Sequence, residues 1–270
     1  IMFESPWESL TMPPQGIVYD MSNEDYHNQV GYSSSAIKTV CKQSLAHYMA
    51  QKPLGDSPAF ALGSAVHATL LEPERDLVTK GPKTRTSKLY KDLYANKKGD
   101  EVVLTEVEYH VHNKMCSAAL DNPVCNALLT HKNRVTESSV FTTDPVSGLN
   151  IKTRPDLYIP ETGQIVDIKT TIDASPKGFA EQVGKYHYHV QAAFYMLTCK
   201  LAGLKAKEFS FIAIEKTAPY MAHLHVVSPE LMIEATKKVK ETLALIAEAN
   251  KSGDYGTGWG DYSTLKVGDF

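Results

Sequence analysis

Apolar residues recur at helical spacing along much of this 270-residue chain. The stretch GYSSSAIKTVCKQSLAHYMAQ carries Ile37, Val40 and Leu45 on one face behind a run of serines, which predicts a helix with a serine N-cap. A second helix is predicted in PAFALGSAVHATLLEP, where a proline ends the pattern. The same spacing predicts helices over residues 105–120, 122–131, 177–202 and 229–250.

Alternating apolar and polar residues predict strands in five other stretches: RVTESSVFTT, NIKTRPDLYI, QIVDIKTT, FSFIAIEK and MAHLHVVS. The turn compositions DPVSG and PETG separate the first three. This order of elements predicts one α/β domain over residues 17–250, in which helices flank a mixed central β-sheet. We expect the proline-containing residues 1–16 to be a loose arm and the glycine-rich residues 251–270 an irregular tail.

Composition narrows the class of protein. The hydrophobic fraction of 43% and the formal charge of -3 are ordinary for a globular chain and exclude a disordered, collagen-like or coiled-coil protein. Four cysteines without a CxxC pair indicate reduced structural thiols. No apolar run is long enough for a membrane-spanning helix, and the first fifteen residues lack the basic charge of a secretory signal, so we expect a cytoplasmic protein with no membrane partner.

A run of basic residues lies in KGPKTRTSKLYKDLYANKKGD, residues 80–100. Charge runs are usually solvated, so a loop and a short helix are one interpretation. A segment that contacts nucleic-acid phosphates is the other. Tyr90 and Tyr94, one helical turn apart, suit base stacking and ordinary packing equally.

Two aspartates occur at matching positions of the hairpin predicted through PETG. If that turn pairs Ile159 with Gln164, Asp156 falls opposite Asp167, and period-2 alternation puts Lys169 on the face of Asp167. Carboxylates directly opposite one another destabilise a strand pair by up to about 1 kcal/mol. A hard cation such as Mg²⁺ or Mn²⁺ between them removes that cost. An exposed edge hairpin without a ligand is the alternative interpretation.

Four short motifs in this order resemble the PD-(D/E)XK nuclease superfamily: Gly-x-x-x-His at 63–67, Pro-Asp at 155–156, Asp-Ile-Lys at 167–169 and Gln-x-x-x-Tyr at 191–195. The first and last are typical of its RecB-type branch. Within that branch, residues 17–250 are most similar to RecE-like (exonuclease VIII) nuclease domains. The resemblance implies a PD-(D/E)XK fold and a Mg²⁺-dependent enzyme, with Mn²⁺ as a substitute, that resects linear duplex DNA 5′→3′ and leaves 3′ single strands for recombination.

The resemblance also implies the site residues. The implied metal ligands are His67, Asp156, Asp167 and the backbone carbonyl of Ile168. Lys169 would orient or activate water and stabilise charge on the scissile phosphate. A lone helical histidine is more often a core or surface residue than a ligand, so the assignment of His67 depends on the motif order.

The helix after the hairpin carries the last motif. Gln191 and Tyr195 would position the phosphate or Lys169, although ordinary packing also accounts for Tyr195. His187 shares their predicted helical stripe but matches no motif, and we expect it to be a surface residue.

Further contacts to DNA are expected upstream of the hairpin. The candidates are Ser33, Ser34, Ser35, Lys38, Glu137 and Arg154. The serines open a predicted helix, whose N-terminus is either a plain cap or a pocket for the 5′-phosphate. Related exonucleases carry an extra acidic residue near the position of Glu137, and an exposed glutamate at the start of a strand is the alternative.

Three other classes of protein compete with the exonuclease. An endonuclease uses the same hairpin, and a catalytically inactive DNA-binding module keeps the same fold. An iron–sulfur nuclease needs cysteines near the C-terminus, and none follows Cys199. The RecE resemblance further implies a homo-oligomer, a tetrameric ring, that works on double-stranded DNA ends beside a RecT-like single-strand annealing protein.

Overall fold

The computed structural model describes residues 14–51 and 57–256. Its helices are α1 (Asn23–Asn28), α2 (Ser34–Lys42), α3 (Leu45–Met49), α4 (Pro58–Leu71), α5 (Lys88–Asn96), α6 (Glu106–Asp121), α7 (Pro123–Leu129), α8 (Pro176–Tyr186), α9 (Tyr188–Leu201) and α10 (Pro229–Ser252). Its strands are β1 (Gly16–Val18), β2 (Val78–Lys80), β3 (Val102–Leu104), β4 (Val135–Thr136), β5 (Ser139–Thr143), β6 (Asn150–Thr153), β7 (Leu157–Ile159), β8 (Gln164–Thr171), β9 (Glu208–Glu215) and β10 (Ala222–Val226).

Serine caps and prolines define where several helices begin. Ser57, Ser175 and Ser228 each accept a backbone hydrogen bond from the first turn of α4, α8 and α10, and a proline follows each serine. A serine oxygen satisfies an N–H group that the helix leaves unpaired, and proline fits the first helical position. The predicted helices over these segments therefore start where their sequence signals are.

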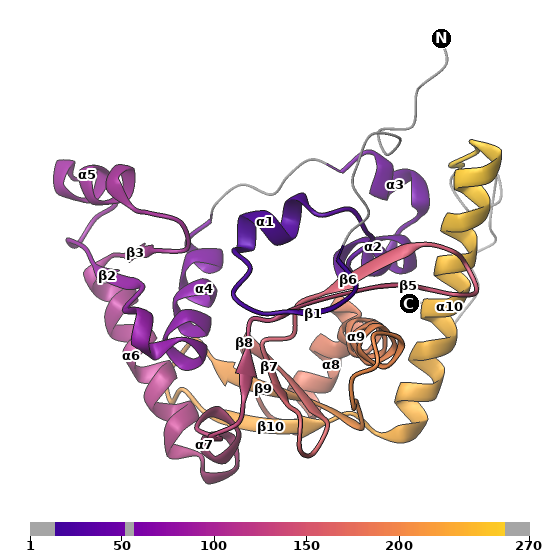
Figure 1. The fold of residues 1–270 in the computed structure, drawn as a ribbon. Helices are drawn as coiled ribbons and strands as arrows, with labels where there is room; N and C mark the ends of the chain where they lie inside the picture. The colour runs from indigo at the N-terminus through magenta and orange to yellow at the C-terminus, as the bar shows by residue number, and fades with distance from the viewer. Residues whose placement is uncertain (1–13, 52–56, 257–270) are drawn as a thin grey trace, which may run out of the picture.

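The central sheet has five strands in the order β10-β9-β8-β7-β4 (Figure 1). β8 lies in the middle, antiparallel to β7 and parallel to β9. A second sheet, β1-β5-β6, and the parallel pair β2-β3 lie outside it. The prediction of a mixed central sheet flanked by helices is confirmed.

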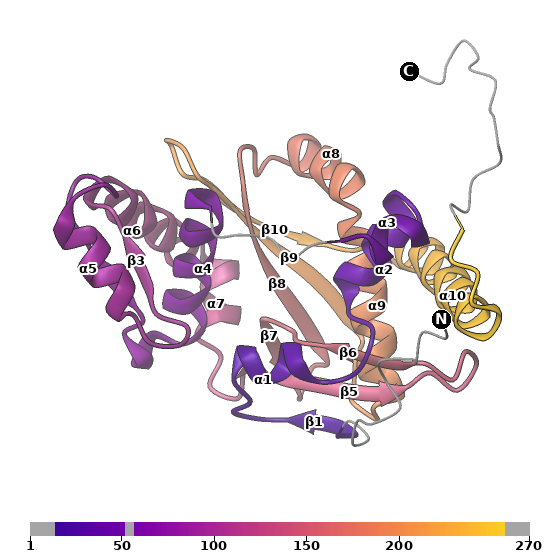
Figure 2. The ribbon, with the colours of Figure 1, turned by 90° about the horizontal axis from the view of Figure 1, so that it is seen from above.

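Helices cover both faces of this sheet (Figure 2). On one face Ile165 of β8 packs with Val190 and Phe194 of α9 and with Val239 of α10. On the other face Val166 and Ile168 pack with residues of α4, α6 and α7. Because successive side chains of a strand point to opposite faces, Asp167 and Lys169 of β8 lie on the α9 side.

Two stretches predicted as single strands are each divided between two sheets, so that part of the prediction is wrong. β4 pairs with β7 in the central sheet, whereas β5 pairs with β1 and β6 in the other. Glu137, at φ 49°, bends the chain between β4 and β5. Residues 154–156 make the matching bend between β6 and β7, where Pro155 offers no N–H to a ladder.

Two predicted helices are also divided. The helix predicted over 177–202 is two helices, because His187 takes the left-handed conformation (φ 54°, ψ 40°) between α8 and α9. His187, Gln191 and Tyr195 therefore do not form one helical stripe, and that prediction is wrong. The helix predicted after Gly31 ends at Lys42, and Leu45 begins α3 behind the cap Ser44.

The ends of the chain lie mostly beyond the described residues. Residues 1–13 of the predicted arm and 257–270 of the predicted tail are outside them. Gly16 already pairs with Phe141 in the second sheet, and α10 continues to Ser252. Among the helices of the described residues, none combines the length and apolar character needed to cross a bilayer.

Candidate active site

The β7–β8 hairpin has the predicted register. Ile159 pairs with Gln164 and Leu157 with Val166, and the N–H of Gly163 closes the turn onto the Ile159 carbonyl at 2.8 Å. Gly163 has φ +78°, and a Cβ there would lie 3.0 Å from the Lys205 carbonyl oxygen. Only glycine takes this backbone conformation without strain in so close an approach, so the turn sets the register.

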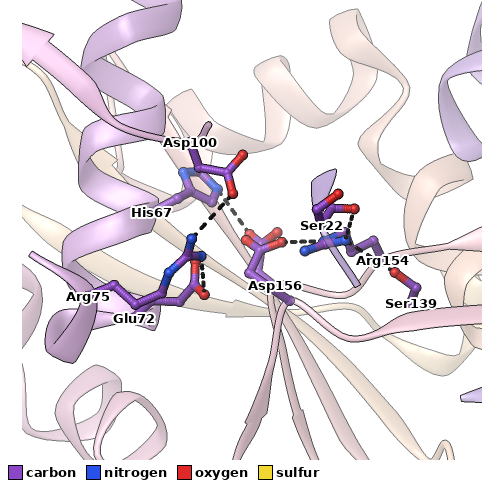
Figure 3. Close-up of polar contacts among 9 residues, drawn as sticks. Ser22, His67, Glu72, Arg75, Asp100, Ser139, Arg154 and Asp156 are labelled. Atoms are coloured by element: carbon purple, nitrogen blue, oxygen red, sulfur yellow. Dashed lines mark hydrogen bonds and ion pairs between the residues drawn. The ribbon is translucent and has the colours of Figure 1, made fainter. Parts of the chain in front are cut away.

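Asp156 lies one residue before β7, where its carboxylate meets two other segments. Its Oδ2 accepts a hydrogen bond from the Ile168 N–H at 2.6 Å and lies 3.0 Å from Nε2 of His67 on α4. Nδ1 of His67 lies 2.9 Å from the Gly63 carbonyl, which can only accept, so Nδ1 donates. Figure 3 shows His67 and Asp156 facing each other across the gap between α4 and the hairpin.

Opposite charge stabilises the ionised forms of this pair. Burial alone would lower the pKa of His67, but the Asp156 carboxylate and the Gly63 carbonyl raise that pKa to about 9. Burial likewise opposes ionisation of Asp156, yet its pKa is held below the ordinary value by His67, Lys169 and the Ile168 N–H. A charge-assisted hydrogen bond therefore holds α4 against the segment that precedes β7.

Asp167 lies on the α9 face of β8 and is only 2% exposed. Its Oδ2 is ion-paired with the Lys169 ammonium, and its Oδ1 accepts a hydrogen bond from Nε2 of Gln191 at 2.6 Å. Lys38 Nζ in turn donates to Oε1 of Gln191 at 3.1 Å. Because an ammonium can only donate, Lys38 holds the Gln191 amide in the orientation that offers its NH₂ to Asp167.

Charge is concentrated around Asp167. Burial and the neighbouring Asp156 raise the pKa of Asp167, against the opposing effect of Lys169. Burial would lower the pKa of Lys169, but Asp167 and Asp156 raise it. The pKa of Lys38 falls to about 8 through burial and the nearby Lys169, which outweigh the attraction of Asp167.

The donor atoms match a hard divalent cation in chemistry. Two buried carboxylates and an imidazole are suitable ligands. Within residues 14–51 and 57–256, no three His, Cys, Asp or Glu side chains surround one point closely enough to hold a metal as they stand. Lys169 and His67 instead occupy the carboxylate oxygens.

Glu137 and Arg154 lie beside Asp156. Nε of Arg154 donates to Glu137 at 2.9 Å, and its NH1 reaches Oγ of Ser139 at 3.2 Å (Figure 3). Burial and the Asp156 charge raise the pKa of Glu137 to about 7, although His67 and Arg154 act in the opposite direction. Glu137 thus lies at the site, at the bend between two strands rather than at the start of one.

The predicted serine cluster lies at the start of α2. Ser33 is the N-cap residue, but its side chain makes no capping bond and instead contacts Ser35 Oγ at 2.8 Å. Ser34 is buried and hydrogen-bonds Tyr195, whose burial raises its pKa well above 10.0. Tyr195 therefore connects α9 to α2 within the core, and its contact with a phosphate stays a prediction.

A cavity of about 950 Å³ opens at His67, one of four candidate catalytic residues, His67, Asp156, Asp167 and Lys169, which we call the catalytic cluster. His67, Gly63, Glu137 and Arg154 line its inner side, and residues of α4, α5 and β3 line the rest. Glu72 and Asp100 also line it, and Arg75 bridges them at 2.8 Å and 3.6 Å (Figure 3). The cavity therefore reaches His67, which contacts Asp156 at 3.0 Å.

Tyr188 is a site residue that the sequence analysis missed. Its ring centroid lies 5.0 Å from Lys169 Nζ and 5.7 Å from Lys38 Nζ. Tyr188 matches none of the four motifs, and neither does its neighbour His187, so no sequence pattern singles it out. Its place depends on the break between α8 and α9, which the periodicity did not indicate.

Comparisons with known proteins agree with this geometry. Residues 33–257 match the family model described as a PDDEXK-like domain of unknown function (DUF3799). No curated protein matches the chain. The crystal structure of a candidate exonuclease from Eubacterium rectale is similar, with a TM-score of 0.60, 18% identity, and 87% of this chain and 88% of that chain covered.

A second solved structure is less similar. It is a phage-related exonuclease from Haemophilus somnus 129PT, with a TM-score of 0.37, 12% identity, and 84% of this chain and 98% of that chain covered. At these identities the first likeness indicates a shared fold alone, and the second is too weak to support an argument.

Proposed function

Because the chain belongs to the PDDEXK-like domain family DUF3799, which has the PD-(D/E)XK nuclease fold, we propose that it is a divalent-metal-dependent DNA exonuclease. The observation that carries the proposal is the convergence of Asp156, Asp167, Lys169 and His67 from a hairpin and a helix, with Gln191 hydrogen-bonded to Asp167. Nucleases of this superfamily generally use divalent metals.

Asp156, Asp167 and His67 would hold the cation, with the Ile168 carbonyl as a further ligand by family resemblance. When bound, such a cation supplies Lewis-acid polarisation of a phosphoryl oxygen and lowers the pKa of water. The Lys169 ammonium lies beside the Asp167 carboxylate, where it would stabilise negative charge on the scissile phosphate. Gln191 holds the Asp167 carboxylate in a fixed orientation, which a reacting geometry requires.

The finer activity is resection of linear duplexes in the 5′→3′ direction to leave 3′ single strands. The order of the four motifs, which resembles RecE-like nucleases, supports this polarity. Ser33, Ser35 and Lys38 would receive the 5′-phosphate at the start of α2, because helix N-terminal N–H groups favour an anion. The name of the Eubacterium rectale structure also supports an exonuclease.

Its partners follow from the same resemblance. The enzyme would act on double-stranded DNA ends as a tetrameric ring, because a closed ring keeps its substrate threaded. It would deliver the 3′ strand to a RecT-like annealing protein. Sedimentation of a monomer at working concentration would remove the ring from the proposal.

The test is digestion of linear duplexes labelled at the 5′ or the 3′ end, with Mg²⁺ and with EDTA. We expect loss of the 5′ label first in Mg²⁺ and no digestion in EDTA. Asp156→Ala should abolish digestion, whereas Asp121→Ala, which removes an exposed carboxylate at the end of α6, should not. Digestion unchanged by chelator refutes the metal dependence, and earlier loss of the 3′ label reverses the polarity.

An endonuclease and an inactive DNA-binding module are the alternatives. Supercoiled plasmid has no ends, so its cleavage at the rate of a linear duplex would favour the endonuclease. Binding without cleavage of either substrate in Mg²⁺ or Mn²⁺ would favour the inactive module.

A further inference from the structure

Four lysine ammonium groups and two tyrosine rings form a continuous strip that leads away from Asp167. We call it the lysine–tyrosine strip; its members are Lys38, Lys42, Lys169, Lys185, Tyr186 and Tyr188. They come from α2, β8 and the junction of α8 with α9. No sequence motif groups them, because they lie in three distant segments.

The inner half of the strip is built on Tyr188. Lys169 Nζ lies 5.0 Å and Lys38 Nζ 5.7 Å from its ring centroid. Lys169 is ion-paired with Asp167, and Lys38 reaches Asp167 through Gln191. This half of the strip is therefore continuous with the catalytic cluster.

The outer half is built on Tyr186. Its ring stacks on Tyr188 with centroids 5.6 Å apart and planes 27° apart. Lys185 Nζ lies 5.4 Å and Lys42 Nζ 5.7 Å from the Tyr186 centroid. Both lysines are exposed, and Tyr186 is 41% exposed, so this half is open to solvent.

The charge of the outer half is not neutralised. Among the described residues, neither Lys42 nor Lys185 is within ion-pair distance of a carboxylate. The tyrosine faces attract each ammonium by about 0.5–1 kcal/mol, which holds like charges close together without an anion. A polyanion that lay along the strip would relieve their repulsion.

The left-handed His187 makes this arrangement possible. It interrupts the helix between the last residue of α8 and the first residue of α9, and Tyr186 and Tyr188 stack across it. In one uninterrupted helix, residues two apart point to different sides and do not face each other. The conformation that divides the predicted helix thus creates the strip.

We propose that the lysine–tyrosine strip binds the phosphodiester backbone of the DNA strand that enters the catalytic cluster. The inference rests on the proposed function, because it names how that site receives its substrate. Consecutive phosphates of one strand advance only about 3.4 Å along the axis of duplex DNA, so several can contact a short row of ammonium groups. Lys169 and Lys38 contact the phosphates nearest the scissile bond, and Lys42 and Lys185 those farther out.

The test measures the affinity of the full chain for a short fluorescein-labelled DNA duplex. Fluorescence anisotropy reports binding, in Ca²⁺ and in EDTA, over a series of salt concentrations. The variant is Lys42→Gln with Lys185→Gln. The matched control is Lys88→Gln with Lys98→Gln, at the start of α5 and two residues beyond its end, which also removes two exposed lysines. Neither pair of residues belongs to the catalytic machinery.

Loss of two phosphate contacts should weaken binding about tenfold near 0.1 M salt and lower the slope of log K against log salt by about 1.4–1.8. The α5 control should leave affinity and slope at wild-type values. A wild-type slope in the strip variant, or an equal loss in the control, overturns the proposal.

A second variant tests the role of the aromatic face. Tyr186→Leu removes the ring that holds Lys42 and Lys185, and should weaken binding about threefold at unchanged charge. Tyr186→Phe keeps the ring and should restore wild-type affinity. Equal affinity of the leucine variant and the wild type refutes the positioning role of the ring.

This assay separates the two proposals, since it needs no turnover. A chain that binds DNA through the strip but cleaves none in Mg²⁺ or Mn²⁺ contradicts the nuclease activity alone. If the strip variant binds and cleaves DNA as the wild type does, the role of the strip is contradicted and the nuclease activity is not.

Discussion

Two regions of this protein combine lysines with tyrosines, and they differ in what the fold does with the charge. In the first, residues 80–98 around α5, the basic residues are clustered in sequence. There Lys80 pairs with Glu106 at 3.2 Å and Arg85 with Glu108 at 2.9 Å. In the lysine–tyrosine strip, Lys169 is the only member ion-paired with a carboxylate of the described residues, that of Asp167.

The tyrosines of the two regions differ in the same way. Tyr90 is buried, and its hydroxyl donates to the Val103 carbonyl at 3.0 Å and accepts from Arg85 at 2.8 Å. It stacks on Tyr94 with centroids 6.2 Å apart. Tyr90 therefore packs within the α5 region rather than stacking on bases. Of the two interpretations that its spacing left open, packing is the one that holds for Tyr90.

The comparison shows that charge density along a sequence is a poor guide to charge on a surface. In the basic run, Lys80 and Arg85 are ion-paired in the folded chain, and Lys97 lies 5.5 Å from the Tyr94 ring centroid. Dispersed lysines that converge on aromatic faces keep their charge available. The following experiments test that difference between the two regions.

The largest effect should come from the inner end of the strip. Lys169→Ala should slow DNA cleavage about 10²–10⁴-fold, because it removes the ammonium at the scissile phosphate. Divalent-metal binding, measured by calorimetry, should persist because an ammonium is not a ligand, whereas Asp167→Ala should lose both. Equal loss of metal binding in the two variants would contradict this division of roles.

The next effect should come from the link between the strip and the catalytic cluster. Gln191→Leu leaves Asp167 without its amide donor and should lower the cleavage rate about 10- to 100-fold through misorientation of the carboxylate. DNA affinity in Ca²⁺ should change little. Gln164→Leu at the other end of β8 is the control, and a similar rate loss there would point to general damage to the strand.

In the α5 region the expected effect is on stability. Arg85→Ala removes the guanidinium that donates to Glu108 and to the Tyr90 hydroxyl, and should lower the free energy of unfolding by about 1–2 kcal/mol. Lys88→Ala, at an exposed position three residues later at the start of α5, should cost less than about 0.5 kcal/mol. Urea denaturation measures both, and equal stability of the two variants would contradict a structural role for Arg85.

The Arg85 effect should depend on pH. Burial opposes ionisation of Glu108, but the Thr105 N–H and Arg85 hold its pKa below the ordinary 4.5. A carboxylate with a lowered pKa stabilises the fold above its unfolded pKa and loses that contribution as the pH falls through the folded value. The stability difference between the wild type and Arg85→Ala should therefore be full at pH 7 and shrink below about pH 4.5. A difference that grows in acid would be inconsistent with this ion pair.

The smallest effect should come from the serines beside the strip. Ser35→Ala should reduce the preference for 5′-phosphate over 5′-hydroxyl ends by about twofold to fivefold, the value of one hydrogen bond. Ser33→Ala should change stability by only a few tenths of a kcal/mol, because the Ser33 side chain makes no capping bond. An unchanged end preference in Ser35→Ala would exclude its contact with the 5′-phosphate.

Sequence patterns alone were sufficient for the parts of the site that depend on near neighbours. The PETG turn, with Gly163 at positive φ, and the alternation of β8 set the hairpin register and place Asp167 and Lys169 on one face. The motif order placed His67 opposite the hairpin, where it meets Asp156 at 3.0 Å. These features depend on backbone geometry within a few residues and on a recurrent motif, so a linear pattern contains them.

Only the tertiary structure decided the rest. The bend at Glu137, the left-handed His187 and the contact of Lys38 with Gln191 arise where distant segments pack, and no local period indicates them. A positive φ in a residue other than glycine costs about 1–2 kcal/mol, so it persists only where the surrounding packing compensates. The register of the hairpin was therefore predictable from the chain itself, whereas the strip that leads from it exists only because packing forces two helices apart at His187.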